Sequence, residues 1–107
     1  MQYINRFNLL PQKSEAFRNW LRENDKLLRE GTPEGWQYLG TWFTVRNFGR
    51  YDCEMRYELD DYAALGADFG SDALQQAWRE IFDSFAPNQG ETYLMKSSED
   101  VIIMKGA

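Results

Sequence analysis

Charged residues that alternate along one short segment are the part of this sequence best suited to chemistry. They stand two positions apart, so in a β-strand their side chains share one face: Asp52, Glu54, Arg56 and Glu58. If that face is closed off from water, desolvation and crowding of like charges would raise a carboxyl pKa toward neutrality. Such a carboxyl group could act as a general acid or base. The alternative is a purely structural polar network, in which Arg56 pairs with the carboxylates beside it.

Three aromatic residues come shortly before this segment and are predicted to share its face: Trp36, Tyr38 and Trp42. Their rings could stack on a planar ligand, with Arg56 lying over them as a cation–π partner. Alternatively, the rings pack against a second copy of the chain. The candidate ligand-binding residues are therefore Trp36, Tyr38, Trp42, Asp52, Glu54 and Arg56. No metal site is expected, because hard cations prefer several converging oxygen ligands and alternate positions of one strand do not supply them.

A predicted β-hairpin positions these residues, with strands over residues 36–46 and 50–59 and a loop at residues 47–49. A three-residue loop that ends in a left-handed glycine sets Phe43 opposite Cys53. The apolar residues of both strands then fall on one face. A two-residue loop would mix carboxylates into that face, because a slip of one residue reverses every side chain, so we reject it.

The two faces of this hairpin have different predicted roles. Trp42 is expected opposite Glu54, and Gly40 opposite Arg56, on a face that nothing covers within one chain. A solvated face rarely holds several large aromatic rings, so a second subunit or a ligand is expected there. The other face should pack under helices and is predicted to carry Leu39, Phe43, Val45, Tyr51, Met55 and Tyr57.

The remaining elements give a β-α-β-β-α-β order. Residues 2–9 predict a strand, and helical spacing of apolar residues then predicts one helix from Pro11 to the stop at Gly31. A short helical segment is expected at residues 62–65, and Ser71 caps a second long helix. Further strands are predicted over residues 91–96 and 101–104. This order is the ferredoxin-like α+β arrangement, an antiparallel sheet with both helices on one face.

Composition limits the function classes. The 107 residues predict one domain, 1–107. The net charge of −5 argues against nucleic-acid partners, and it also argues against binding to anionic membranes, which attract basic proteins. No apolar run approaches a membrane span or a signal peptide, so the default expectation is cytoplasmic. The single cysteine, Cys53, is predicted to be a buried thiol. Because the chain has no histidine, histidine-ligated haem, histidine metal sites and imidazole catalysis are excluded, and no cofactor is expected.

Three features together resemble the dimeric α/β-barrel superfamily, which includes the NIPSNAP proteins and the cofactor-independent antibiotic-biosynthesis monooxygenases. They are the element order, the hairpin over residues 36–59, and the segment YELDDYAAL at residues 57–65, where an aromatic strand runs into an acidic and aromatic helix start. NIPSNAP-like proteins are the nearest in pattern. The resemblance implies two subunits packed sheet to sheet, with a cavity either between each sheet and its own helices or along the barrel axis. Enzymes of the group often use His, Asn, Trp or Arg in that cavity.

These observations predict a homodimer that binds a small aromatic or hydrophobic molecule in a cavity lined by Trp, Tyr and Arg. Two alternatives stay open. One is a cofactor-independent monooxygenase that activates an electron-rich aromatic substrate toward oxygen. The other is a purely structural or interaction dimer without a pocket.

Overall fold

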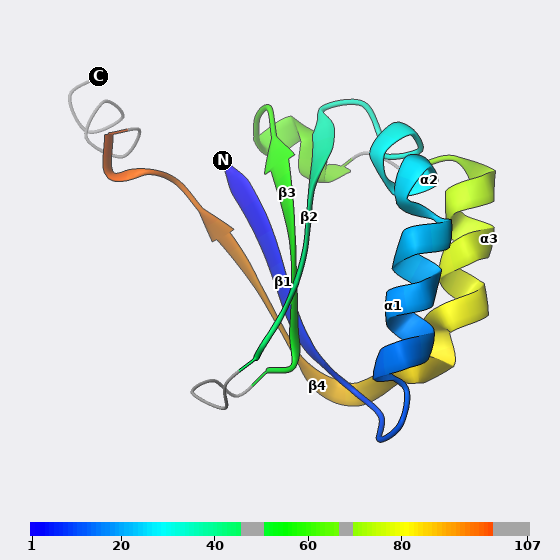
Figure 1. Cartoon of the computed structure of the whole chain (residues 1–107). Helices are drawn as coiled ribbons and strands as arrows, with labels where there is room; N and C mark the ends of the chain where they lie inside the picture. The colour runs from blue at the N-terminus through cyan, green and yellow to red at the C-terminus, as the bar shows by residue number, and fades with distance from the viewer. Residues whose placement is uncertain (46–50, 67–69, 100–107) are drawn as a thin grey trace.

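The computed structural model describes residues 1–45, 51–66 and 70–99. Its elements are β1 (Gln2–Leu9), α1 (Ser14–Glu23), α2 (Asp25–Glu30), β2 (Trp36–Phe43), β3 (Cys53–Leu59), the 3-10 helix η1 (Tyr62–Gly66), α3 (Asp72–Ile81), the 3-10 helix η2 (Phe82–Ser84) and β4 (Phe85–Met95). The four strands form an antiparallel sheet in the order β2-β3-β1-β4. All three α-helices lie against one face of this sheet (Figure 1). The predicted α+β class is confirmed, and the strand order is compatible with a ferredoxin-like fold.

The core lies between that face and the helices. Phe17 of α1 is fully buried, and its ring centroid is 5.7 Å from that of Phe7 in β1 and 5.3 Å from that of Phe85 in β4. The indole Nε1 of Trp20 donates a hydrogen bond to the carbonyl oxygen of Ala77 at 2.9 Å, which fastens α1 to α3. Apolar stripes on both helices thus fill one layer over the sheet.

The first helical region begins later than predicted and is broken in two. Gln12 has a φ of +67°, outside the helical region, so α1 begins only at Ser14. At Asn24 the side-chain Nδ2 donates to the carbonyl oxygen of Trp20 at 2.9 Å. An asparagine that bonds to nearby backbone in this way competes with regular helix, and α2 starts at the next residue. The predicted cap at Ser71 is confirmed, since its side chain accepts a hydrogen bond from the Leu74 N–H.

The register of β2 against β3 is confirmed over half of the hairpin and wrong over the rest. Phe43 pairs with Cys53 and Gly40 with Arg56, as predicted, but a bulge at Leu39 then shifts the register. Two residues of a bulged strand oppose one residue of its partner, so the alternation of faces slips by one position. Loop residues 47–49 and the predicted strand at 101–104 lie outside the described residues.

The bulge moves Trp36 and Tyr38 onto the helix-covered face, so their predicted placement on the open face is wrong. Tyr38 pairs with Tyr57 and is only 4% exposed. Val45, predicted under the helices, is exposed instead. Of the predicted core face, Phe43, Met55 and Tyr57 do pack against the buried cluster.

The last strand is longer than predicted. It starts at Phe85, which pairs with Leu9 and places its ring 5.1 Å from that of Phe7. Pro87 does not interrupt it, because β4 is an edge strand of the sheet formed by the described residues and has hydrogen-bonded neighbours there on one side only. Within the described part of the chain, no helix is both long and apolar enough to cross a membrane.

Candidate functional site

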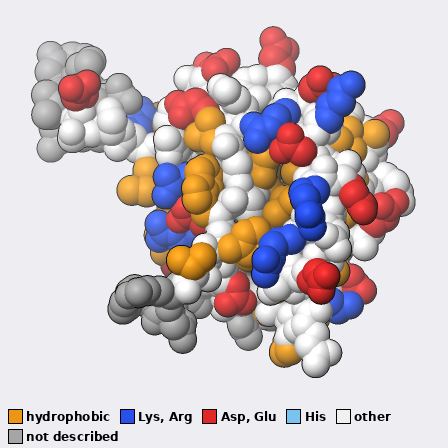
Figure 2. Space-filling model, viewed as in Figure 1, with side chains coloured by type: hydrophobic (Ala, Val, Ile, Leu, Met, Phe, Trp, Pro, Cys, Tyr) orange, Lys and Arg blue, Asp and Glu red, His pale blue; other side chains and the backbone are white. Residues whose placement is uncertain are grey.

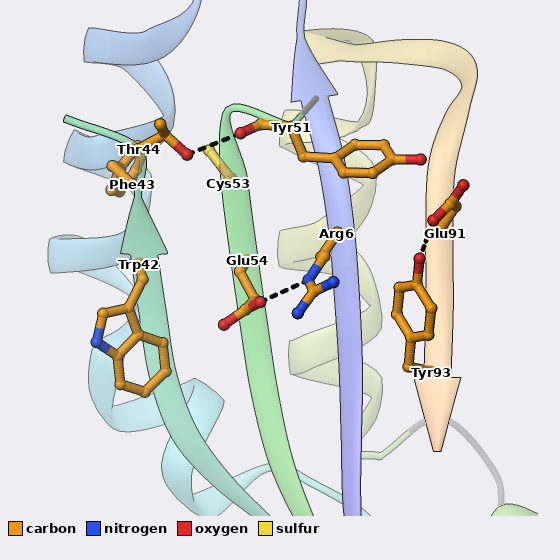
Figure 3. Close-up of a pocket in the computed structure, with 9 residues that line it drawn as sticks. All are labelled: Arg6, Trp42, Phe43, Thr44, Tyr51, Cys53, Glu54, Glu91 and Tyr93. Atoms are coloured by element: carbon orange, nitrogen blue, oxygen red, sulfur yellow. Dashed lines mark hydrogen bonds and ion pairs between the residues drawn. The ribbon is translucent and has the colours of Figure 1, made fainter. Parts of the chain in front are cut away.

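The face of the sheet away from the helices carries a row of paired charges. Strand pairing aligns Trp42 of β2, Glu54 of β3, Arg6 of β1 and Glu91 of β4 across the sheet. Their side chains project from four different strands on the side opposite the helices (Figure 3). Figure 2 shows this side from the edge of the sheet, and hydrophobic, basic and acidic side chains are mixed along it. We call this surface the open sheet face.

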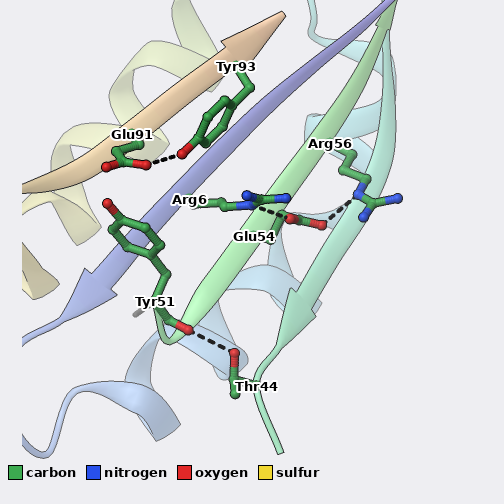
Figure 4. A network of polar contacts seen from close by, with 7 residues as sticks. All are labelled: Arg6, Thr44, Tyr51, Glu54, Arg56, Glu91 and Tyr93. Atoms are coloured by element: carbon green, nitrogen blue, oxygen red, sulfur yellow. Dashed lines mark hydrogen bonds and ion pairs between the residues drawn. The ribbon is translucent and has the colours of Figure 1, made fainter. Parts of the chain in front are cut away.

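Two arginines share one carboxylate at the centre of the open sheet face. Arg6 Nε donates to Glu54 Oε1 at 2.7 Å, and Arg56 Nε donates to Glu54 Oε2 at 2.6 Å (Figure 4). The Glu54 side chain is 18% exposed, and those of the two arginines are 37% and 39% exposed. One negative charge therefore bridges two positive charges in a partly desolvated place.

The pKa of the Glu54 carboxyl group lies below its ordinary value. Burial of the carboxylate acts to raise this pKa, but the hydrogen bonds and charges of Arg6 and Arg56 together outweigh burial. Glu54 therefore stays ionised at neutral pH and holds protons weakly. That direction is opposite to the one a general acid or base needs near neutrality.

Two half-exposed aromatic rings flank the charged row. The guanidinium carbon of Arg56 lies 5.1 Å from the Trp42 ring centroid, and that of Arg6 lies 4.9 Å from the Tyr93 ring centroid. Trp42 is 49% exposed and Tyr93 is 36% exposed. The Tyr93 hydroxyl donates to Glu91, a hydrogen bond that raises the pKa of Tyr93. Each ring thus has one cation against it and an accessible surface remaining.

An open hollow of about 420 Å³ lies between these rings, and Tyr51 reaches over β1 toward Glu91 at its side (Figure 3). A second hollow of about 410 Å³ lies farther along the open sheet face. Arg6 lines both hollows, so they adjoin. Volumes of this size are within the range of pockets that hold small molecules.

The structure brings together three of the six predicted site residues: Trp42, Glu54 and Arg56. Trp36 lies on the opposite face, where its indole Nε1 donates to the carbonyl oxygen of Ala64 at 2.7 Å. Tyr38, also on that face, shares a hydrogen bond with the hydroxyl of Thr41.

Asp52 lines neither hollow. Its carboxylate Oδ2 accepts a hydrogen bond from the Leu9 N–H at 3.1 Å, and its own N–H donates to Asn8 Oδ1 at 2.8 Å. These two bonds tie the start of β3 to the end of β1. Asp52 therefore has a structural role in the described chain.

Sequence reasoning missed the contributions of β1 and β4. The sequence of residues 2–9 does not by itself determine whether Asn5 or Arg6 faces the charged side, and the pairing of Arg6 with Glu54 shows that Arg6 does. Glu91 and Tyr93 were not singled out, although their alternation within the last strand was a usable signal.

Cys53 is buried as predicted, and burial raises the pKa of its thiol to about 12, with a smaller contribution from Asp52. Over residues 1–45, 51–66 and 70–99, no group of three or more His, Cys, Asp or Glu side chains is placed to hold a metal ion.

No known protein-family model matches this chain, and no curated protein is detectably similar to it in sequence. The likeness to dimeric α/β-barrel proteins therefore stays a prediction.

Proposed function

We propose that two copies of this chain pack through their open sheet faces and hold a small aromatic or hydrophobic molecule between them. One observation carries the proposal. The half-exposed rings of Trp42 and Tyr93 stand on either side of the Arg6–Glu54 pair, and all four side chains line one hollow. This is the mixture of aromatic surface and few placed polar groups that small-molecule sites typically have.

The case for a homodimer comes from what the helices leave uncovered. Besides the two rings, Met95 on β4 is half exposed, and exposed apolar side chains gathered on one face favour an interface there. A two-fold axis brings the same patch of both copies together. The patch alternates Arg6 and Arg56 with Glu54 and Glu91, so two copies meet without an excess of like charge.

The required area is modest. A standard interface buries about 800 Å² per partner. That is about a tenth of the 7717 Å² surface of this chain, which is the usual share for a small protein in a stable complex.

The other two candidates differ in what the open sheet face does. A cofactor-independent monooxygenase needs a group that takes a proton from its substrate, and the lowered pKa of Glu54 does not favour that role. A purely structural dimer would fill the hollow with side chains of the partner. We retain both as outcomes of the experiment below.

Light scattering after size separation tests the dimer, and tryptophan fluorescence tests binding of 2-naphthol, a neutral planar probe. We expect a mass twice the 12.6 kDa of one chain at micromolar concentration. Replacing Trp42 by alanine should weaken dimer and probe binding by about tenfold or more, because central tryptophans carry much of the energy of an interface. Phe82→Ala is the matched control, since Phe82 is also exposed but follows α3 at η2.

Each outcome decides between the candidates. A monomer, or an unchanged dimer in Trp42→Ala, would overturn the proposal. A dimer that binds no probe would support the structural alternative. Oxygen uptake with a phenolic substrate would favour the monooxygenase.

A further inference from the structure

A continuous chain of contacts joins the two rings that flank the hollow of about 420 Å³. The guanidinium carbon of Arg56 lies 5.1 Å from the Trp42 ring centroid. The guanidinium carbon of Arg6 lies 4.9 Å from the Tyr93 ring centroid. Between the two arginines, Glu54 accepts a hydrogen bond from Arg56 at 2.6 Å and one from Arg6 at 2.7 Å (Figure 4). The contacts therefore cross the whole sheet, from β2 to β4, through one carboxylate.

Glu54 is the centre of this chain of contacts, and its charge holds the two arginines in place. Its side chain is 18% exposed, whereas those of Arg6 and Arg56 are 37% and 39% exposed. Two guanidinium groups that share one carboxylate are like charges, and they repel each other when the carboxylate charge is removed. A long side chain released in this way regains its rotamer freedom in water. Glu54 thus keeps each guanidinium against its ring.

The Trp42 ring is held from one side and accessible from the other. It folds back along β2 onto Gly40, where an added Cβ would lie 3.3 Å from the ring atom Cη2. Gly40 pairs with Arg56, so the ring lies beside the guanidinium of the neighbouring strand. Trp42 lines the hollow of about 420 Å³, whereas Arg56 lines the second hollow. Arg56 therefore supports the ring from the side away from the hollow that the ring lines.

We propose that Glu54 is a positioning residue, which through Arg6 and Arg56 holds the Trp42 and Tyr93 rings in the orientation that accepts a planar ligand. This inference rests on the proposed function, because it narrows the ligand of the same site to planar aromatic molecules. A flat ring gains from stacking on aligned rings beyond the apolar area that it buries, and a puckered ring of the same size does not. The preference for planar molecules therefore depends on Glu54.

Calorimetry on the full chain at pH 7 tests this with two neutral probes, 2-naphthol and decahydro-2-naphthol. The two probes share one carbon skeleton and one hydroxyl group, but only 2-naphthol is planar. We expect the parent chain to bind 2-naphthol about threefold to tenfold more tightly than decahydro-2-naphthol, which is the contribution of ring stacking.

Glu54→Gln should reduce this preference to about twofold or less. The amide oxygen of glutamine can accept from one arginine, but its NH₂ group cannot accept from the other. Binding of decahydro-2-naphthol should change by less than about twofold, because it does not depend on aligned rings. A general loss of stability would weaken both probes alike, so the ratio of the two affinities separates positioning from a merely structural role.

Two further variants complete the experiment. Arg56→Gln releases the Trp42 ring and leaves the contact between Arg6 and Tyr93, so it should give an intermediate preference. Glu80→Gln on the exposed surface of α3 is the matched control and should keep the preference of the parent. Thermal melting establishes that each variant is folded, and if Glu54→Gln does not fold, Arg56→Gln decides alone.

The outcomes separate this inference from the proposed function. If 2-naphthol binds and Glu54→Gln keeps the preference of the parent, the positioning role is overturned while the proposed function stands. An equal loss of both probes in Glu54→Gln and Arg56→Gln would also overturn it, since the role of Glu54 is then structural. A parent chain that binds both probes equally would overturn the preference for planar molecules. If neither probe binds, both proposals fail.

Discussion

Glu54→Gln is the substitution that most directly tests the charged row. It preserves the shape of the side chain but removes the negative charge between Arg6 and Arg56, whose Nε atoms lie 2.7 and 2.6 Å from the carboxylate oxygens. An exposed ion pair is worth about 1 kcal/mol or less. Because both arginines are more than a third exposed, we assign each contact that smaller value and not the value of a buried pair.

The expected loss is therefore about 1 to 2 kcal/mol in the free energy of unfolding for the two contacts together. For a chain of this size that corresponds to a fall in Tm of roughly 5 to 10 °C. Urea unfolding followed by tryptophan fluorescence measures it, at one protein concentration for all variants, because the stability of a dimer depends on concentration. Glu80→Gln on the exposed surface of α3 is the matched control and should stay within about 0.5 kcal/mol of the parent.

The direction of the Glu54 pKa shift determines how the stability contributed by Glu54 changes with pH. The folded pKa of Glu54 lies below its unfolded value, so the carboxylate contributes stability above the unfolded pKa, about 4.3. That contribution is lost as pH falls through the lower, folded pKa. The difference between the parent and Glu54→Gln should thus be full at pH 7 and shrink below about pH 4. Equal stabilities of Glu54→Gln and Glu80→Gln at pH 7, or a deficit that persists unchanged at pH 3, would refute the reasoning.

Two further predictions concern the strands that carry the site. Gly40→Ala should cost about 1 to 3 kcal/mol in chemical unfolding, since Gly40 has a φ of +142° and an added Cβ would lie 3.3 Å from the Trp42 ring. Gly66→Ala, where a Cβ would meet nothing within 4 Å, is its control, and equal stabilities would contradict the bulge geometry. The thiol of Cys53, with its pKa near 12, should react with a disulfide reagent at pH 8 far more slowly in the folded chain than in urea. Equal rates would show that the thiol is accessible.

Local sequence patterns determined much of this fold. The strict alternation after residue 50 identified β3, and the choice of loop length placed Gly40, Trp42 and Phe43 opposite the correct partners. The Ser71 cap and the helical segment at Tyr62–Gly66 were also readable, because a cap or a short turn depends on neighbouring residues only. Burial of Cys53 followed from its face of the strand.

Tertiary structure decided which residues meet on the open sheet face. Arg6 and Glu54 are 48 positions apart, and only the insertion of β1 between β3 and β4 brings them together. The bulge at Leu39 reversed the faces of Trp36 and Tyr38, and the local alternation of apolar and polar residues does not predict this bulge. The physical reason is that strand side chains repeat every two residues, so one extra residue in one strand exchanges core and surface for everything beyond it.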